Sequence, residues 1–242
     1  MKNFILFKSI MTLVSFLALT ACPPYAHEEN PLPVTQTSAN SDAINQQLSK
    51  TSTGQQTLNS MNALVNRGYT IQIQLLSQAE IQNINGHSGG GYKIDGNTVS
   101  IYLNNALSIT DQSHAVAHEV VHINDDLEID QFLIQYPHVK SSSEDLITRY
   151  KTTSLSSFDE RVISYVIGTL FCAEARAYTI NQQLANEGLN TELFAKGNTL
   201  PQFIDQNYIS RFGTQYGSNA NAMSAWCLSQ SSMTDIQYQY IW

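Results

Sequence analysis

Five consecutive residues combine the side chains that point most directly to chemistry: His118, Glu119, Val120, Val121 and His122. Because an α-helix has about 3.6 residues per turn, two histidines four positions apart lie on one face. Neutral imidazoles at this spacing can both bind one Zn²⁺. Glu119 lies roughly 100° around the helix from His118, so its carboxylate can reach a water molecule beside the metal and act as a general base.

The surrounding residues predict that the motif lies on a helix with one buried face. The apolar positions recur at helical spacing: Val116, Val120, Ile123 and Leu127. The histidines follow a different stripe: His114, His118 and His122. We expect this helix to begin at Thr110 or Asp111, either of which can be its N-cap, and to end near Leu127. The alternative is a helix with two incidental histidines.

A catalytic zinc site usually has three protein ligands and one open position, so the two histidines need a third residue. The pattern HExxHxxGxxH would supply a histidine, but Asp125 and Glu128 occupy its glycine and histidine positions. Glu174 is the better candidate, because it interrupts an apolar face of a later helix, where an unpaired carboxylate would be costly. The alternative role for Glu174 is a structural ion pair with Arg161 or Arg176.

The motif HEVVH, followed later by Glu-Ala-Arg-Ala-Tyr at residues 174–178, resembles the gluzincin-type zinc metallopeptidases. The resemblance spans residues 69–187 and implies a small sheet followed by two helices that hold one zinc ion. It implies these metal ligands: His118, His122 and Glu174. Glu119 would then take a proton from the zinc-activated water and pass it to the leaving amine.

Two positions depart from the family pattern. Many gluzincins have an aspartate four residues after the ligand glutamate, where this chain has Tyr178, and Asn124 replaces a position that is often apolar. Four residues are candidates for the donor that stabilises the oxyanion, with Tyr178 placed first: Tyr178, Tyr165, Tyr92 and His114. Three residues are candidates for orienting the histidines: Asp125, Asp126 and Asn181.

The elements that must position these residues have recognisable patterns. Two further segments are helical, each followed by a glycine that would end it: 44–67 before Gly68, and 158–186 before Gly188. Three segments are typical of strands, the last two joined as a hairpin: 69–75, 92–94 and 98–103. The glycine-rich run at 87–91 lacks both phosphate-binding patterns and is interpreted as a connector.

For the strand over 98–103 we predict which residues are buried and whether the strand contacts a substrate. Its odd-numbered residues, Val99 to Leu103, would face the core, and its even-numbered residues, Ser100 to Asn104, would face outward. The resemblance implies that this strand is the edge along which an extended peptide substrate lies.

The N-terminus predicts export. Residues 1–21 combine lysines with an apolar run too short to span a bilayer stably. The sequence LTAC at 19–22 resembles the lipobox of bacterial lipoproteins, which implies that Cys22 is lipidated and begins the mature chain. The alternative is an ordinary secretory signal cut near Ala21 or Ala26. We therefore expect a lipid-anchored protein of the cell envelope on the periplasmic side, with the outer membrane favoured over the inner.

Charge and cysteine content fit that location. The net charge of −8 argues against nucleic acid or an anionic lipid surface as a partner. If Cys22 is lipidated, Cys172 and Cys227 remain, and in an oxidising compartment this pair predicts a disulfide. Two free buried thiols are the alternative.

The sequence as a whole predicts one α+β domain, mostly helical with a small antiparallel sheet, over residues 44–242, preceded by a flexible tether over 22–43. We expect a zinc peptidase that hydrolyses peptide bonds. The alternatives are a non-catalytic scaffold lipoprotein that retained the fold and an envelope metal-binding protein. An intact Glu119 argues against a scaffold, which has no use for that carboxylate. The substrate stays open between peptide, protein and peptidoglycan stem peptide.

Overall fold

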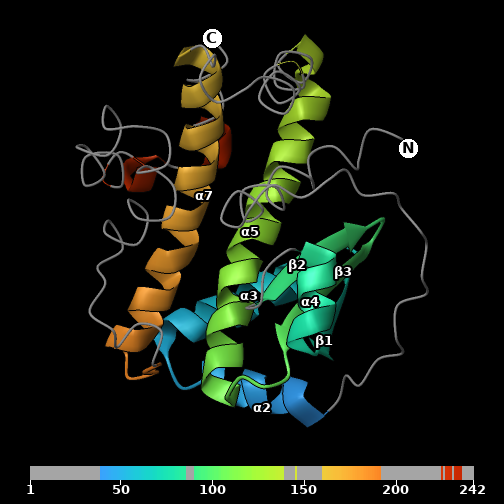
Figure 1. Cartoon of the computed structure of the whole chain (residues 1–242), viewed down its shortest axis with the longest axis vertical. Coiled ribbons are helices and arrows are strands. Elements are labelled where there is room, and N and C mark those ends of the chain that lie inside the picture. Colours follow the sequence, from blue (N-terminus) through green and yellow to red (C-terminus); the bar gives the residue numbers. More distant parts are fainter. Residues whose placement is uncertain are drawn as a thin grey trace. The chain divides into compact units, whose positions relative to one another are not determined.

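The computed structural model describes residues 39–85, 90–138, 145, 160–191, 225, 227–230 and 232–235. Over these residues the protein is mixed α+β, mostly helical with one three-stranded sheet (Figure 1). It divides into two compact units, Met1–Glu119 and Val120–Trp242, and the boundary falls inside one continuous helix. Cys22 and its lipobox lie outside the described residues. No helix in the described part is long and apolar enough to cross a membrane.

Two helices open the described part of the first unit, α2 (Ala39–Leu48) and α3 (Ser52–Asn66). Thr51 separates them as the N-cap of α3, since its hydroxyl oxygen accepts a hydrogen bond of 3.0 Å from the backbone N–H of Gly54. Gly68 ends α3 as predicted, with a φ of 90° that an L side chain rarely adopts. Because α2 begins at Ala39, the last residues of the segment predicted as a tether, 39–43, are helical.

The sheet contains β1 (Thr70–Leu76), β2 (Gly90–Asp95) and β3 (Thr98–Asn104) in the order β1-β3-β2. β2 and β3 form the predicted hairpin, antiparallel around Gly96, whose φ is 56°. β1 runs parallel to β3, and the chain returns between them through α4 (Gln78–Asn85) and β2. The sheet is therefore mixed, and the prediction of an antiparallel sheet is only partly correct.

β3 lies between the other two strands, so the expectation that it is the sheet edge is wrong. Its odd-numbered residues are fully buried, as predicted: Val99, Ile101 and Leu103. The expectation that its even-numbered residues face outward is wrong for Tyr102 and Asn104, which are 1% and 7% exposed. On that second face Tyr102 packs with Leu76 of β1 and Ile81 of α4, because α4 covers this side of the sheet.

The HEVVH motif lies on α5 (Ile109–Gln135), which extends beyond the predicted helix at both ends. Ser108 is its N-cap: the hydroxyl oxygen accepts a hydrogen bond of 3.1 Å from the N–H of Asp111 and donates one of 2.7 Å to the Asp111 carboxylate. The expectation that Thr110 or Asp111 caps the helix is therefore wrong. The predicted apolar stripe is buried: Val116, Val120, Ile123 and Leu127.

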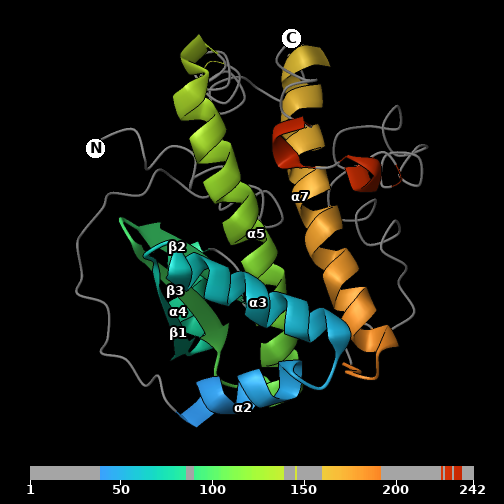
Figure 2. The same ribbon diagram turned by 180° about the vertical axis from the view of Figure 1, so that it is seen from behind.

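The second unit contains the later part of α5 and the long helix α7 (Glu160–Asn186), which lie side by side in both views (Figures 1 and 2). The helix predicted over 158–186 is confirmed, and Gly188 follows it with a φ of 99°. Cys172 on α7 and Cys227 form the predicted disulfide, with their Cα atoms 5.1 Å apart.

Candidate metal centre

α5 places His118 and His122 one turn apart, as the spacing predicts. His122 is buried with 3% exposure, and His118 is half-buried. The helix thus presents one imidazole inside the protein and one at its margin, which is the arrangement that a site open on one side requires.

α7 supplies the carboxylate. Oε1 of Glu174 lies 3.7 Å from Nε2 of His122, and the two side chains are 14% and 4% exposed. A carboxylate that is largely removed from water needs a positive charge beside it, either a protonated imidazole or a bound cation. The alternative role for Glu174, an ion pair with Arg176, is not supported, because Arg176 donates to Asp125. The side chain of Arg161 lies outside the described residues.

The metal-ligating atoms of His118, His122 and Glu174 all lie within 4.8 Å of one another, and the three residues can hold a metal ion. In a tetrahedral site with ligand bonds of about 2.1 Å, neighbouring ligand atoms are about 3.4 Å apart. The 3.7 Å between Nε2 of His122 and Oε1 of Glu174 is close to this value, and no pair of the three ligand atoms is more than 4.8 Å apart. The three ligands named from the sequence are therefore brought together.

Glu119 follows His118 directly and is half-buried. Its carboxylate lies near the start of β2: a Cβ built on Gly90 would be 3.8 Å from Oε1 of Glu119 and 3.0 Å from the backbone oxygen of Tyr102. The distance of 3.0 Å to the Tyr102 oxygen is tighter than a Cβ normally makes, so a side chain at residue 90 would require a shift there, whereas 3.8 Å to Glu119 is an ordinary contact distance. The interpretation of residues 87–91 as a connector is wrong for Gly90 and Gly91, which belong to β2.

The sequence held a signal for Gly90 that the connector interpretation missed. Two glycines stand directly before the strand pattern at residue 92, and glycine inside or beside a strand often marks a close approach of backbone to another group. Here that group is the backbone oxygen of Tyr102 on β3, and the carboxylate of Glu119 lies at an ordinary contact distance.

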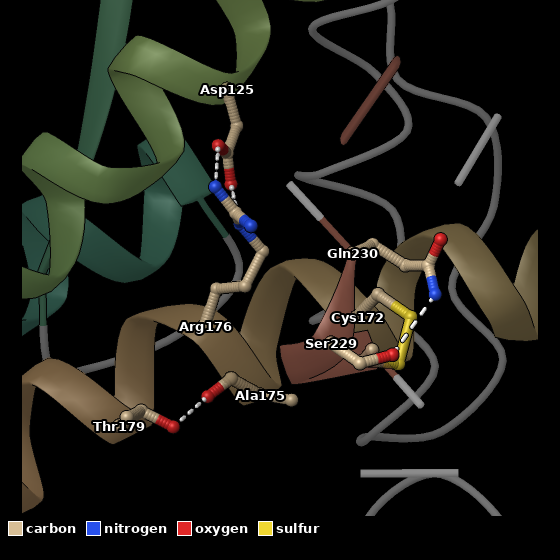
Figure 3. Close-up of a disulfide and its surroundings, with 8 residues drawn as sticks. Asp125, Cys172, Ala175, Arg176, Thr179, Ser229 and Gln230 are labelled. Atoms are coloured by element: carbon tan, nitrogen blue, oxygen red, sulfur yellow. Dashed lines mark hydrogen bonds and ion pairs between the residues drawn. A yellow bond between two sulfur atoms is a disulfide. The ribbon is translucent and has the colours of Figure 1, made fainter. Parts of the chain in front are cut away.

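A bidentate ion pair lies beside the metal ligands. Nε and Nη2 of Arg176 donate to Oδ2 and Oδ1 of Asp125, both at 3.3 Å (Figure 3). Burial raises the pKa of Asp125 to about 6, although Arg176 opposes the shift. Because Arg176 engages both carboxylate oxygens, Asp125 is a weaker candidate for orienting a histidine. Asp126 and Asn181 are buried, and their role in orienting the histidines stays a prediction.

The candidates for the oxyanion donor are distributed over three elements. Tyr178 is half-buried on α7, one turn after Glu174. Tyr92 is half-buried on β2, and His114 is buried on α5 with 3% exposure. The side chain of Tyr165 lies outside the described residues. The assignment of Tyr178 stays a prediction.

Residues 227–235, called here the C-terminal segment, include two residues that contact the helices of the second unit. Its Cys227 is bonded to Cys172, two residues before Glu174 on α7 (Figure 3). Its Thr234 donates a hydrogen bond of 3.1 Å to Oε1 of Glu128 on α5. The segment therefore bridges α5 and α7 close to the metal ligands.

No protein-family model matches this chain, and neither a curated protein nor a solved structure matches it at a significant level. The function is therefore inferred from the residues and their geometry.

Proposed function

We propose that this protein is a zinc metallopeptidase of the gluzincin type, exported to the cell envelope and anchored there by a lipid on Cys22. The observation that supports it best is the meeting of His118, His122 and Glu174 on two helices, with Glu119 next to the first histidine. A protein that binds a metal without catalysis needs the three ligands but has no need of Glu119.

The donor set favours zinc. Two imidazole nitrogens and one carboxylate oxygen are a frequent set in catalytic zinc sites, whereas Ca²⁺ and Mg²⁺ prefer oxygen ligands alone. Three protein ligands leave one tetrahedral position open, which a reactant can occupy.

The catalytic steps assign distinct tasks to the residues. The side chains of His118, His122 and Glu174 would hold the zinc, which would supply Lewis acidity for activating water and polarising the scissile carbonyl. Glu119 accepts the proton from the attacking water and delivers it to the leaving amine nitrogen. Tyr178 donates a hydrogen bond to the oxyanion.

β2 provides the surface for an extended substrate. It is an edge strand, since β3 is its one neighbour among the described strands of the sheet. A peptide that adds to this edge as a further strand runs past Gly90, beside the carboxylate of Glu119. This assigns to β2 the substrate role that the sequence had suggested for β3.

The test uses the mature chain from residue 22, purified with its disulfide intact. Wild type should contain about one zinc per chain and cleave members of a peptide library, and Glu119→Gln should keep its zinc while losing 10²–10⁴-fold in rate. Glu187→Gln, the same chemical change at an exposed position after α7, serves as the matched control and should retain full activity.

Two results would overturn the proposal. Loss of zinc from Glu119→Gln would make Glu119 a ligand rather than the base. If the wild type binds zinc tightly and cleaves no peptide, the protein would be a metal-binding protein and not a peptidase.

A further inference from the structure

The ion pair between Asp125 and Arg176 connects the two helices that carry the buried ligands. Asp125 lies one turn after His122 on α5, and Arg176 lies two residues after Glu174 on α7. Figure 3 shows the Arg176 side chain extending from α7 to the Asp125 carboxylate on α5. On both helices, the pair therefore lies within one turn of the contact between His122 and Glu174.

The geometry of this pair constrains the helices more than a single hydrogen bond would. Two parallel N–H groups of a planar guanidinium meet the two oxygens of one carboxylate, both at 3.3 Å. Such a bidentate contact fixes orientation as well as distance. Sliding or rotating α7 against α5 would break at least one of its two hydrogen bonds.

Stability alone does not account for the pair. The Asp125 side chain is 6% exposed, and the cost of removing a charge from water offsets much of the attraction in such pairs. Apolar residues of similar volume often stabilise a fold equally well or better. What a buried bidentate pair provides is one preferred register between two elements.

Register decides whether Glu174 can reach a metal. A displacement of α7 by one residue along its axis moves the Glu174 carboxylate by about 1.5 Å. Ligand bonds tolerate deviations of about 0.2 Å. A helix pair that is free to slide by one residue would therefore lose the third ligand.

We propose that Asp125 and Arg176 are positioning residues that hold α7 in the register at which Glu174 completes the metal site with His118 and His122. This rests on the metal site of the proposed function but not on catalysis. The two side chains act through the helices.

The experiment measures metal binding rather than hydrolysis. Metal-free protein with its disulfide intact is titrated with Zn²⁺ against a competing chelator, and the absorption spectrum of the Co²⁺ form reports the ligand set. Asp125→Asn and Arg176→Met should each lower Zn²⁺ affinity 10–100-fold, the effect expected for residues that support metal ligands. The double variant should lose no more than the stronger single variant, because the two residues act as one unit.

Three controls separate positioning from general destabilisation. Thr179→Ala removes a hydroxyl that bonds only within α7, to the carbonyl of Ala175 at 2.7 Å, and should leave Zn²⁺ affinity within twofold. Glu174→Gln marks the effect of altering the ligand itself. Arg176→Lys keeps the positive charge but cannot make two parallel hydrogen bonds, so it should lose less Zn²⁺ affinity than Arg176→Met. It replaces Arg176→Met in the test if that variant does not fold.

The outcomes are distinct. Folded Asp125→Asn and Arg176→Lys that bind Zn²⁺ as tightly as wild type, with an unchanged Co²⁺ spectrum, would refute positioning and leave the proposed function intact. Weakened binding in a protein whose wild type hydrolyses nothing would support positioning and refute the peptidase. A wild type that binds neither metal would refute both.

Discussion

The stability of the protein as a function of pH tests how burial and charge compete at Asp125. Burial raises the pKa of this carboxyl group from 3.8 to about 6. A group whose pKa is higher in the folded than in the unfolded protein stabilises the fold below its unfolded pKa, and that contribution disappears as the pH rises through the folded pKa. The contribution of Asp125 to the unfolding free energy should therefore be complete below pH 3.8 and gone above about pH 6.

The size of the effect follows from the shift. A difference of about 2 pKa units, at 1.36 kcal/mol per unit, corresponds to about 3 kcal/mol of unfolding free energy. The side chain is 6% exposed, so solvent screening does little to reduce this value. It is a large fraction of the stability of a typical domain.

Asp125→Asn keeps the shape of the side chain and removes its titration. Wild type and variant are unfolded by urea at about pH 4, 5, 6 and 7, with a chelator present and the disulfide intact. Subtracting the variant from wild type isolates the part of the pH dependence that depends on the carboxyl group of Asp125. That difference should fall by about 2 kcal/mol from about pH 4 to about pH 7, since part of the contribution is already lost at pH 4.

Two results would refute the reasoning. A difference that does not change with pH would mean that the carboxyl group of Asp125 has an ordinary pKa. A difference that rises with pH would mean that attraction to Arg176 exceeds the cost of burial.

Three further predictions concern the metal, the disulfide and β2. His118→Ala should lose most of its zinc, measured by elemental analysis, and retention of one zinc per chain would exclude His118 as a ligand. Replacing Cys172 and Cys227 by serine should lower the unfolding free energy by roughly 4 kcal/mol, measured by urea unfolding, and a change below about 1 kcal/mol would contradict the chain-entropy estimate. Gly90→Val should slow peptide hydrolysis without loss of zinc, because its Cβ would lie 3.0 Å from the Tyr102 carbonyl oxygen and force β2 to shift beside Glu119. An unchanged kcat/KM would show that the position of β2 at residue 90 does not affect hydrolysis.

Local patterns predicted the elements that carry the ligands. The HEVVH helix and the helix of Glu174 have apolar residues at regular helical spacing, and Gly68 and Gly188 end their helices as expected. Glu174 could be selected because a lone acid among alanines and a cysteine is costly unless it meets a positive partner. The N-cap of α5 was predicted wrongly, although Ser108 and Asp111 have the spacing of a capping box that could have identified it.

The errors concern contacts between distant segments. The order of strands is a tertiary property, and a central strand covered on both faces buries even-numbered residues such as Tyr102 that an alternating pattern assigns to solvent. The partner of Arg176 could not be chosen from the sequence, because Asp125 and Glu174 are both within its reach once two helices pack. α4 was not predicted: it is a short helix rich in Gln and Asn, so its sequence has only a weak apolar periodicity.

The disulfide changes how the chain is connected. The bond between Cys172 and Cys227 closes residues 172–227 into a covalent ring. A single cut of the backbone anywhere between these cysteines opens the ring but releases no fragment, so the segment with Thr234 stays attached to α7. Such a nicked chain would run as one species on a non-reducing gel and as two after reduction. One cleavage between these cysteines would therefore leave Glu174 covalently linked to both halves of the chain.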